Sequence, residues 1–307
     1  MFWIGSLSMS KIFEFFGYLA TDRSDVALET AAKYHCPFLN KKCTKLLKVG
    51  ASGVCALSNL TENVICCPNR LYGDDYLLLK IIAQKAFGKK LNLYVANEAI
   101  EKAKVEGGAI AVFGHEWGGE LHLSQRKGTG NYFMDWVLVV LDNNGEVDEF
   151  TAIEVQTIDT TGNYQAGRES LLKDRSETKV HAGFNWENVN KRIIPQIIYK
   201  GQVLQRESKC KSGMFFVCNR PVFNHVIDRL GGREKLPIFP KQPASVTFIA
   251  YDYAKQASDW SDGKIMPLEI VDEHCTTVYK IQEAFSSIEL PEGDVYLKTI
   301  CKTLYEQ

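Results

Sequence analysis

The sequence predicts an α/β protein with a mixed central sheet flanked by helices, and a small N-terminal module rich in cysteine. Short apolar segments typical of strands alternate with longer segments typical of helices. Residues 31–75 are instead rich in Cys, Asn, Gly and Pro, with little periodicity. The chain has 307 residues, of which 45% are hydrophobic and 24% charged, so it is long enough for one large domain with a small appendage.

The elements are expected in the following order. Residues 10–30 look helical, and with residues 31–75 they form an N-terminal unit that spans residues 1–75. A second unit, residues 76–307, begins with a helix over residues 76–87 that ends at the capping residue Gly88. Strands are predicted at 109–113, 134–141, 150–157, 213–219 and 245–253, and helices at 163–176, 186–206 and 221–232. The remainder is an acidic C-terminal extension without assigned elements.

Charge and hydropathy bear on whether the protein binds nucleic acid or a membrane. The net charge of −1 speaks against nucleic acid, but Ala31 to Lys48 contains five lysines and no acid. A local basic face is sufficient to neutralise phosphates, although such a run is also typical of a solvated surface. No apolar run reaches the roughly 18 residues that span a bilayer, and the apolar start is too short for a signal peptide. We therefore expect a cytoplasmic protein that does not insert into a membrane.

A predicted β-hairpin carries the residues most indicative of chemistry. The strands at 134–141 and 150–157 flank the tight-turn sequence DNNG at 142–145. Glu154 and Gln156 point to one face of their strand, and Asp135 lies opposite Ala152 or Ile153, one position from Glu154. Carboxylates in apolar strands are costly unless they are compensated, and Mg²⁺ compensates two that converge.

This arrangement suits phosphodiester hydrolysis. A cation between Asp135 and Glu154 polarises a scissile phosphate and lowers the pKa of an attacking water molecule, which Gln156 is placed to orient. The usual residue at the third position of such a set, which Gln156 occupies here, is Lys, and Lys adds a positive charge that Gln does not. Glu120 is a fourth candidate, as a further ligand or a supporting carboxylate, and Glu116 is its nearest rival.

Five of the nine cysteines fall within 32 residues, and four of them are predicted to hold a structural metal ion. Thiolates in a loop-rich segment suit tetrahedral iron or zinc, and such a site stabilises a segment poor in apolar residues. Buried free cysteines are the alternative. A hydrolase built on the adjacent His35 and Cys36 is disfavoured, because sequence neighbours seldom face each other. The four are Cys36, Cys43, Cys55 and Cys67, with Cys66 as the alternative to Cys67.

Several motifs together resemble the NotI-type restriction endonucleases over roughly residues 30–210. They are HCPFLNKKCTK (35–45), SGVCAL (52–57), ICCPNRLYGDDY (65–76), GHEWGGEL (114–121), DWVLV (135–139), TAIEVQTID (151–159) and NWENVNKRIIPQIIYKG (185–201). The resemblance implies a prokaryotic, homodimeric type II enzyme of a restriction-modification system, with a PD-(D/E)XK nuclease core and Mg²⁺ chemistry. It implies an acidic pair and glutamine at Asp135, Glu154 and Gln156, an upstream glutamate at Glu120, and structural iron at the four-cysteine metal-binding module.

The resemblance also implies double-stranded DNA as the partner and a GC-rich palindrome with a GGCC centre as the target. Guanine is typically read by Arg or Lys in the major groove. Candidate contacts after the catalytic strand are Gln165, Arg168, Lys173 and Arg175, although a solvated helix face is equally consistent with them. Two other functions remain open: a catalytically inactive DNA-binding protein, and a nuclease acting on flaps, junctions or RNA.

Overall fold

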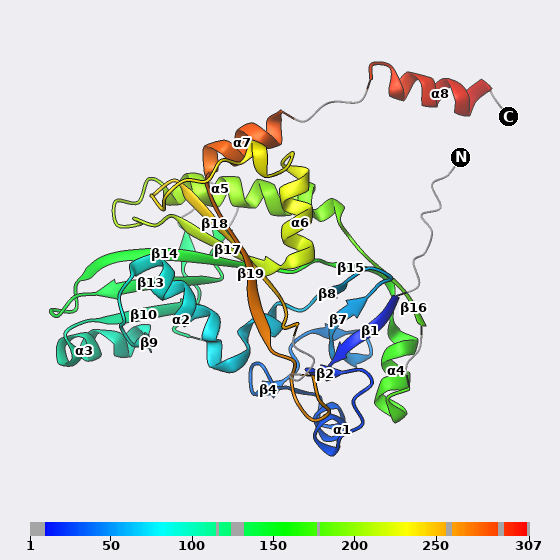
Figure 1. The fold of residues 1–307 in the computed structure, drawn as a ribbon, viewed down its shortest axis with the longest axis horizontal. Helices are drawn as coiled ribbons and strands as arrows, with labels where there is room; N and C mark the ends of the chain where they lie inside the picture. The colour runs from blue at the N-terminus through cyan, green and yellow to red at the C-terminus, as the bar shows by residue number, and fades with distance from the viewer. Residues whose placement is uncertain are drawn as a thin grey trace.

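A seven-stranded mixed sheet forms the centre of the protein (Figure 1). The structure, a computed structural model, describes residues 10–114, 117–123, 132–176, 179–255, 260–287 and 292–305. The strand order is β19-β18-β17-β14-β13-β10-β9; the pairs β9/β10, β14/β17 and β17/β18 are parallel and the others antiparallel. Their bounds are β9 Leu93–Val95, β10 Ala109–Gly114, β13 Trp136–Leu141, β14 Val147–Gln156, β17 Met214–Asn219, β18 Ser245–Tyr253 and β19 Leu268–Thr277. The predicted mixed sheet is confirmed.

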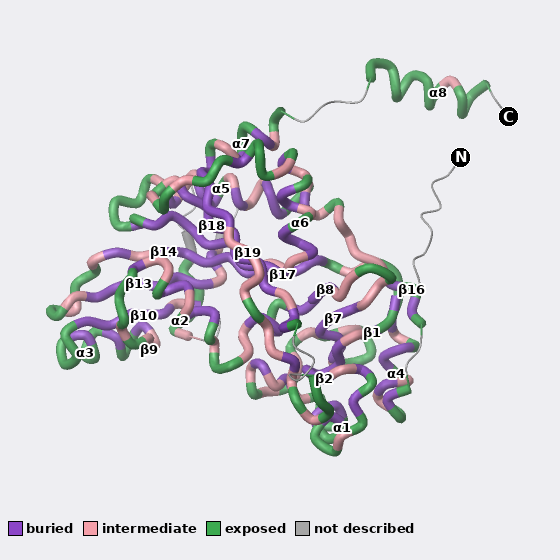
Figure 2. The backbone as a smooth tube through the Cα atoms, in the orientation of Figure 1, coloured by how far each residue is buried: buried purple, intermediate pink, exposed green. Residues whose placement is uncertain are grey.

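Helices cover both faces of this sheet. Trp136, Leu138 and Val140 of β13 pack in one core with α2, whereas Val137 and Val139 pack in the other core, with α3, α5, α6 and α7. This alternation follows from the two-residue period of a strand. Figure 2 shows the central strands buried between these layers. The helices are α2 Gly73–Phe87, α3 Ala96–Glu106, α5 Ile194–Leu204, α6 Arg220–Arg229 and α7 Val278–Ser286.

The predicted helix over residues 10–30 is wrong for most of its length. The segment forms strands β1 (Ser10–Phe15) and β2 (Tyr18–Leu19), and only α1 (Asp25–Ala32) is helical. Phe16 and Gly17 turn the chain between the strands with φ values of 49° and 86°. The apolar side chains of Ile12, Phe13, Phe15 and Phe16 fit either element locally, and pairing of β1 with segments distant in sequence selects the strand.

β1 belongs to a second sheet of order β15-β16-β1-β7-β8, with β2 attached to β1. Its other strands are β7 Val54–Ser58, β8 Asn63–Ile65, β15 Thr160–Asn163 and β16 Lys179–Phe184, and α4 (Gln165–Asp174) lies between β15 and β16 in the chain. Two strands of the N-terminal sheet therefore come from beyond residue 75, and the predicted boundary there stays a prediction.

Short elements complete the described chain. They are the two-residue strands β3 His35–Cys36, β4 Lys41–Lys42, β5 Leu46–Leu47, β6 Gly50–Ala51, β11 His122–Leu123 and β12 Tyr132–Phe133, with the helical turns η1 Pro68–Tyr72, η2 Val189–Ile193 and η3 Arg233–Lys235. The last helix, α8 (Val295–Tyr305), has no buried residue and lies apart from the body in Figure 1. None of the helices that the structure describes is long and apolar enough to cross a membrane.

Candidate active site

The acidic pair lies where β13 and β14 meet. Trp136 pairs with Ile153, which places Asp135, the residue before β13, opposite Glu154. This is one residue further along β14 than predicted, because the register shifts at a bulge between Val140 and Leu141. Asp135 Oδ2 accepts a hydrogen bond of 2.7 Å from the backbone N–H of Val155, which fixes the carboxylate beside its partner strand. The two residues of the acidic pair therefore lie directly opposite each other, and not one position apart as predicted.

Burial dominates the electrostatics of this pair. Glu154 is only 7% exposed, and burial, with the charge of Asp135 acting in the same direction, raises its pKa to about 7 against the opposing charge of Lys200. Burial also raises the pKa of Asp135, which the Val155 amide and Lys200 oppose and the charge of Glu120 reinforces. Even beside the ammonium of Lys200, the site therefore disfavours two ionised carboxylates when no metal cation is bound.

A buried lysine that sequence reasoning missed completes the cluster. Lys200 of α5 places its Nζ 2.5 Å from Glu154 Oε1, and its side chain is 8% exposed. Glu154 Oε2 is buried and has no hydrogen-bond partner in the part of the chain that is described. The signal in the sequence was a lysine on the apolar stripe of the helix predicted at 186–206. An unpartnered carboxylate oxygen beside Asp135 fits a divalent cation.

Gln156 and Glu120 occupy different positions around the pair. The Gln156 amide donates a hydrogen bond of 2.6 Å to the carbonyl of Thr157, so it is bonded to its own strand end. Glu120 is exposed and lines a hollow of about 120 Å³ together with Asp135 and Tyr72. The rival Glu116 lies outside the described residues.

A larger hollow lies between the end of β14 and the cysteine module. It measures about 630 Å³ and is lined by Gln156, Lys45 and Cys67, among others. Thr44 and Asn69 line both hollows and are hydrogen-bonded to each other at 3.0 Å. The hollow beside Asp135 and the hollow beside the cysteine module are therefore neighbours that share these two side chains.

The five N-terminal thiols lie close enough to influence one another's pKa values. The pKa of Cys36 is raised by burial and by Cys43; that of Cys55 by burial and, among other charges, by Cys67 and Cys36; and that of Cys67, to about 12, by burial and by Cys66 and Cys43. Cys66 Sγ lies instead 3.6 Å from the carbonyl of Cys55 and 3.9 Å from Lys45 Nζ. Within the described ranges, no three His, Cys, Asp or Glu side chains are arranged to hold a metal ion.

Two of the four predicted DNA contacts are buried. The Arg168 guanidinium donates hydrogen bonds of 2.8 and 2.6 Å to the carbonyl of Ala51, and Arg175, 0% exposed, donates to the carbonyls of Ala27 and Leu19. These arginines connect α4 and the turn after it to the N-terminal segment, and their donors do not reach solvent. Gln165, bonded to Glu169 at 2.8 Å, and the exposed Lys173 remain candidates.

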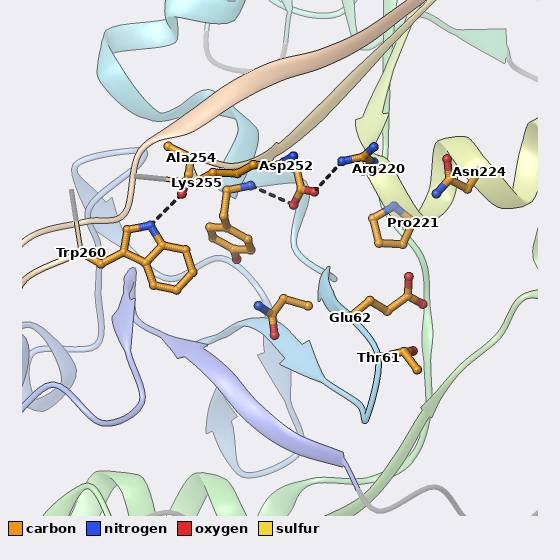
Figure 3. Close-up of a pocket in the computed structure, with 11 residues that line it drawn as sticks. Thr61, Glu62, Arg220, Pro221, Asn224, Asp252, Ala254, Lys255 and Trp260 are labelled. Carbon is orange, nitrogen blue, oxygen red and sulfur yellow. Dashed lines mark hydrogen bonds and ion pairs between the residues drawn. The ribbon is translucent and has the colours of Figure 1, made fainter. Parts of the chain in front are cut away.

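Figure 3 shows a separate hollow of about 490 Å³ between β8, the start of α6 and the end of β18. Its charged side chains have both signs, and Arg220 lies 3.8 Å from Asp252. Trp260 Nε1 donates a hydrogen bond of 2.7 Å to the carbonyl of Ala254. None of the predicted site residues lines this hollow.

Comparison with known proteins identifies the family. The family model described as restriction endonuclease NotI matches residues 21–257, a span that contains the four cysteines, the hairpin and Lys200. A comparison with curated proteins finds no match. The matched span exceeds half of the chain, and the resemblance noted from the sequence motifs is confirmed. The protein therefore belongs to the NotI family of restriction endonucleases and is a type II, site-specific deoxyribonuclease.

Proposed function

We propose that this enzyme hydrolyses double-stranded DNA at a GC-rich palindrome with a GGCC centre, using Mg²⁺ in a PD-(D/E)XK active site. The observation that carries the proposal is the placement of Asp135 opposite Glu154 on paired strands, with Glu154 Oε2 buried and without a hydrogen-bond partner among the residues that the structure describes. Two carboxylates on paired strands, of which Glu154 is buried with an oxygen that lacks a partner among the described residues, provide the hard ligands that Mg²⁺ prefers. Glu120 stands at the rim of the same hollow and is the further carboxylate ligand or support.

The role of each residue follows from the position of its side chain. When bound, Mg²⁺ supplies the charge that polarises the scissile phosphate and lowers the pKa of the attacking water. Asp135 and Glu154 hold the cation, and the Val155 amide keeps Asp135 in place. Gln156 reaches the water only if its hydrogen bond to Thr157 opens when DNA binds.

Digestion of a sequenced phage genome tests this function, with Mg²⁺ and with a chelator as the paired conditions. Discrete Mg²⁺-dependent fragments that map to one GC-rich palindrome support it. Fragments that persist in chelator contradict the Mg²⁺ mechanism, and a smear contradicts palindrome specificity. No cleavage by folded protein indicates a blocked or unusual substrate, or an enzyme that has lost catalysis.

The protein is further proposed to act as a homodimer, because a two-fold assembly matches the symmetry of a palindrome and places one active site on each strand. Lysines of the N-terminal loops and Lys173 are proposed to contact phosphates, and Gln165 a base or phosphate. Sedimentation equilibrium of the protein, alone and with a palindromic duplex, measures the number of subunits in the complex. A monomer on the cleaved duplex would contradict the dimer.

The four-cysteine module is proposed to hold structural iron or zinc through Cys36, Cys43, Cys55 and Cys67. The mutual influence of the thiols supports a shared site, and the contacts of Cys66 Sγ with Lys45 and the Cys55 carbonyl favour Cys67 as the fourth ligand. Tetrahedral thiolate sites of this kind suit both metals.

The neighbouring cysteines provide a matched pair of variants. We expect Cys67→Ser to lose the bound metal and unfold at a lower temperature, because metal affinity contributes directly to folding free energy. Cys66→Ser, equally buried, is expected to keep the metal. Elemental analysis of the purified proteins and thermal unfolding measure both effects. The reverse pattern would assign Cys66 as the ligand, and wild-type protein without metal would identify buried free thiols.

A further inference from the structure

A lysine occupies a core position of α5. Ile197, Lys200, Gly201 and Leu204 form the buried stripe of this helix, with the spacing of one helical face. A Cβ on Gly201 would lie 2.9 Å from Val278 Cγ2 and 3.6 Å from Val246 Cγ2, so α5 packs closely against α7 and β18. An apolar residue is the ordinary occupant of such a position, because a buried ammonium loses its hydration. A lysine there therefore requires a specific compensating partner.

That partner is one oxygen of the proposed metal ligand. Lys200 Nζ lies 2.5 Å from Glu154 Oε1, and the two side chains are 8% and 9% exposed. The buried arginines Arg168 and Arg175 instead donate to backbone carbonyls. Lys200 thus differs from them in contacting a carboxylate of the acidic pair.

The two carboxylate oxygens of Glu154 therefore differ in their hydrogen bonding. Oε1 is bonded to Lys200, whereas Oε2 is buried without a partner among the described residues. The third position of the strand contributes no charge, because Gln156 is neutral and its amide is bonded to the Thr157 carbonyl. The ammonium group beside the acidic pair is therefore delivered by α5, 46 residues further along the chain.

We propose that Lys200 is a positioning residue of the active site. Its ammonium group fixes Oε1 of Glu154 so that Oε2 is presented to the divalent cation, and it supplies the positive charge that Gln156 lacks at the third position of the strand. The proposal rests on the Mg²⁺-dependent function proposed above. It makes Lys200 part of the catalytic constellation and not only a partner in a structural ion pair.

The test compares Lys200→Met and Lys200→Arg with a control, Lys191→Met, which removes an exposed lysine from η2, directly before α5. We expect Lys200→Met to lower the cleavage rate on the order of 100-fold, comparable to the loss of one preorganised donor. Lys200→Arg is expected to recover part of the rate, and Lys191→Met to match the wild type. Circular dichroism and thermal unfolding verify that each variant is folded.

Cation affinity provides a readout that does not depend on cleavage. Calorimetric titration of Ca²⁺ into the enzyme–DNA complex is expected to give a Kd about tenfold weaker for Lys200→Met, because Glu154 is no longer held in place. If Lys200 only neutralised charge, its removal would lower the Kd for Ca²⁺, since removing a positive charge beside the carboxylates strengthens cation binding. Unchanged or tighter Ca²⁺ binding would overturn the proposal.

A second-site variant separates charge supply from structural support. The double variant Gln156→Lys/Lys200→Met returns the ammonium to the strand, and we expect it to cleave faster than Lys200→Met alone. A double variant no faster than Lys200→Met would overturn the charge-supply role. Asp135→Asn is measured in parallel: if it cleaves like the wild type, the proposed active site itself fails, whereas an inactive Asp135→Asn with a fully active Lys200→Met overturns the role of Lys200 alone.

Discussion

Asp135→Asn and Glu154→Gln are each expected to lower Mg²⁺-dependent cleavage by on the order of 10³-fold or more, since a bound cation contributes several kcal/mol to transition-state stabilisation. Both substitutions keep the size of the side chain and remove the charge that holds the cation. Asp135 lies before β13 and Glu154 on β14, and their sequence neighbours Trp136 and Val155 belong to the core; Glu154 is buried and Asp135 partly buried. Single-turnover cleavage of a palindromic duplex at saturating enzyme measures the chemical step directly.

DNA affinity distinguishes a lost active site from a lost fold. Without metal, we expect both variants to bind the duplex at least as tightly as the wild type, because removing a carboxylate reduces repulsion of the phosphates. Asp148→Asn is the matched control, since Asp148 lies on the same strand but is partly exposed and paired with Lys89 at 2.7 Å. Wild-type cleavage by both Asp135→Asn and Glu154→Gln would refute the site assignment.

A large loss of stability is expected when the buried ion pair between the two sheets is broken. Arg70 Nε lies 2.8 and 2.9 Å from the two carboxylate oxygens of Glu14, and the side chains are 3% and 0% exposed. Tyr253 donates a further hydrogen bond of 3.3 Å to Glu14, and Arg70 also donates to the carbonyl of Met266. The pair therefore connects β1, η1, β18 and the segment before β19.

We expect Arg70→Met to destabilise the protein by about 3–5 kcal/mol, because it leaves a carboxylate buried without its cation. Burial already raises the pKa of Glu14 against the opposing charge of Arg70, so the isolated carboxylate is costly. At roughly 2–4 °C per kcal/mol, the midpoint of thermal unfolding should fall by about 10 °C. Chemical denaturation monitored by fluorescence gives the free energy of unfolding independently.

Two controls separate burial from charge. Lys80→Met removes a lysine that lies 3.1 Å from Asp75, in a pair whose side chains are 50% and 83% exposed, and should change stability by less than about 1 kcal/mol. The double variant Glu14→Leu/Arg70→Met removes both buried charges and should recover much of the loss. An Arg70→Met protein as stable as Lys80→Met would show that solvent reaches Glu14.

Local pattern was sufficient for five strands of the central sheet, β10, β13, β14, β17 and β18, whereas β9 and β19 were not predicted, the latter because it falls in the C-terminal extension that was left without assigned elements. The strands of the hairpin followed from apolar segments around an Asp-Asn-Asn-Gly turn, where the Asp142 carboxylate accepts hydrogen bonds from the N–H groups of Asn144 and Glu146. The end of α2 followed from Gly88, whose φ of 65° suits glycine and whose N–H bonds to the carbonyl of Gln84. Turn chemistry and side-chain period depend on neighbours in sequence, so they can be read without a fold.

The same local reasoning placed residues 10–15 in a helix, because it has no access to a pairing partner. β1 is a strand since β7 and β16 lie on either side of it, and β16 enters the chain only at residue 179. Arg168 and Arg175 likewise looked like surface cations, whereas the N-terminal segment buries them and accepts their hydrogen bonds. Burial of a charged side chain is decided by what packs over it.

The sequence by itself determined the α/β class, the family and the hairpin with Asp135 and Glu154, and it predicted a four-cysteine site whose fourth member it left open between Cys66 and Cys67. Only the tertiary structure decided that Asp135 lies directly opposite Glu154, that Cys66 turns toward Lys45, and that the cation beside the acidic pair comes from α5. The physical reason is the range of the interactions. Periodicity and turn residues act over a few positions, whereas a bulge shifts a register and a helix from 46 residues away brings Lys200 to Glu154.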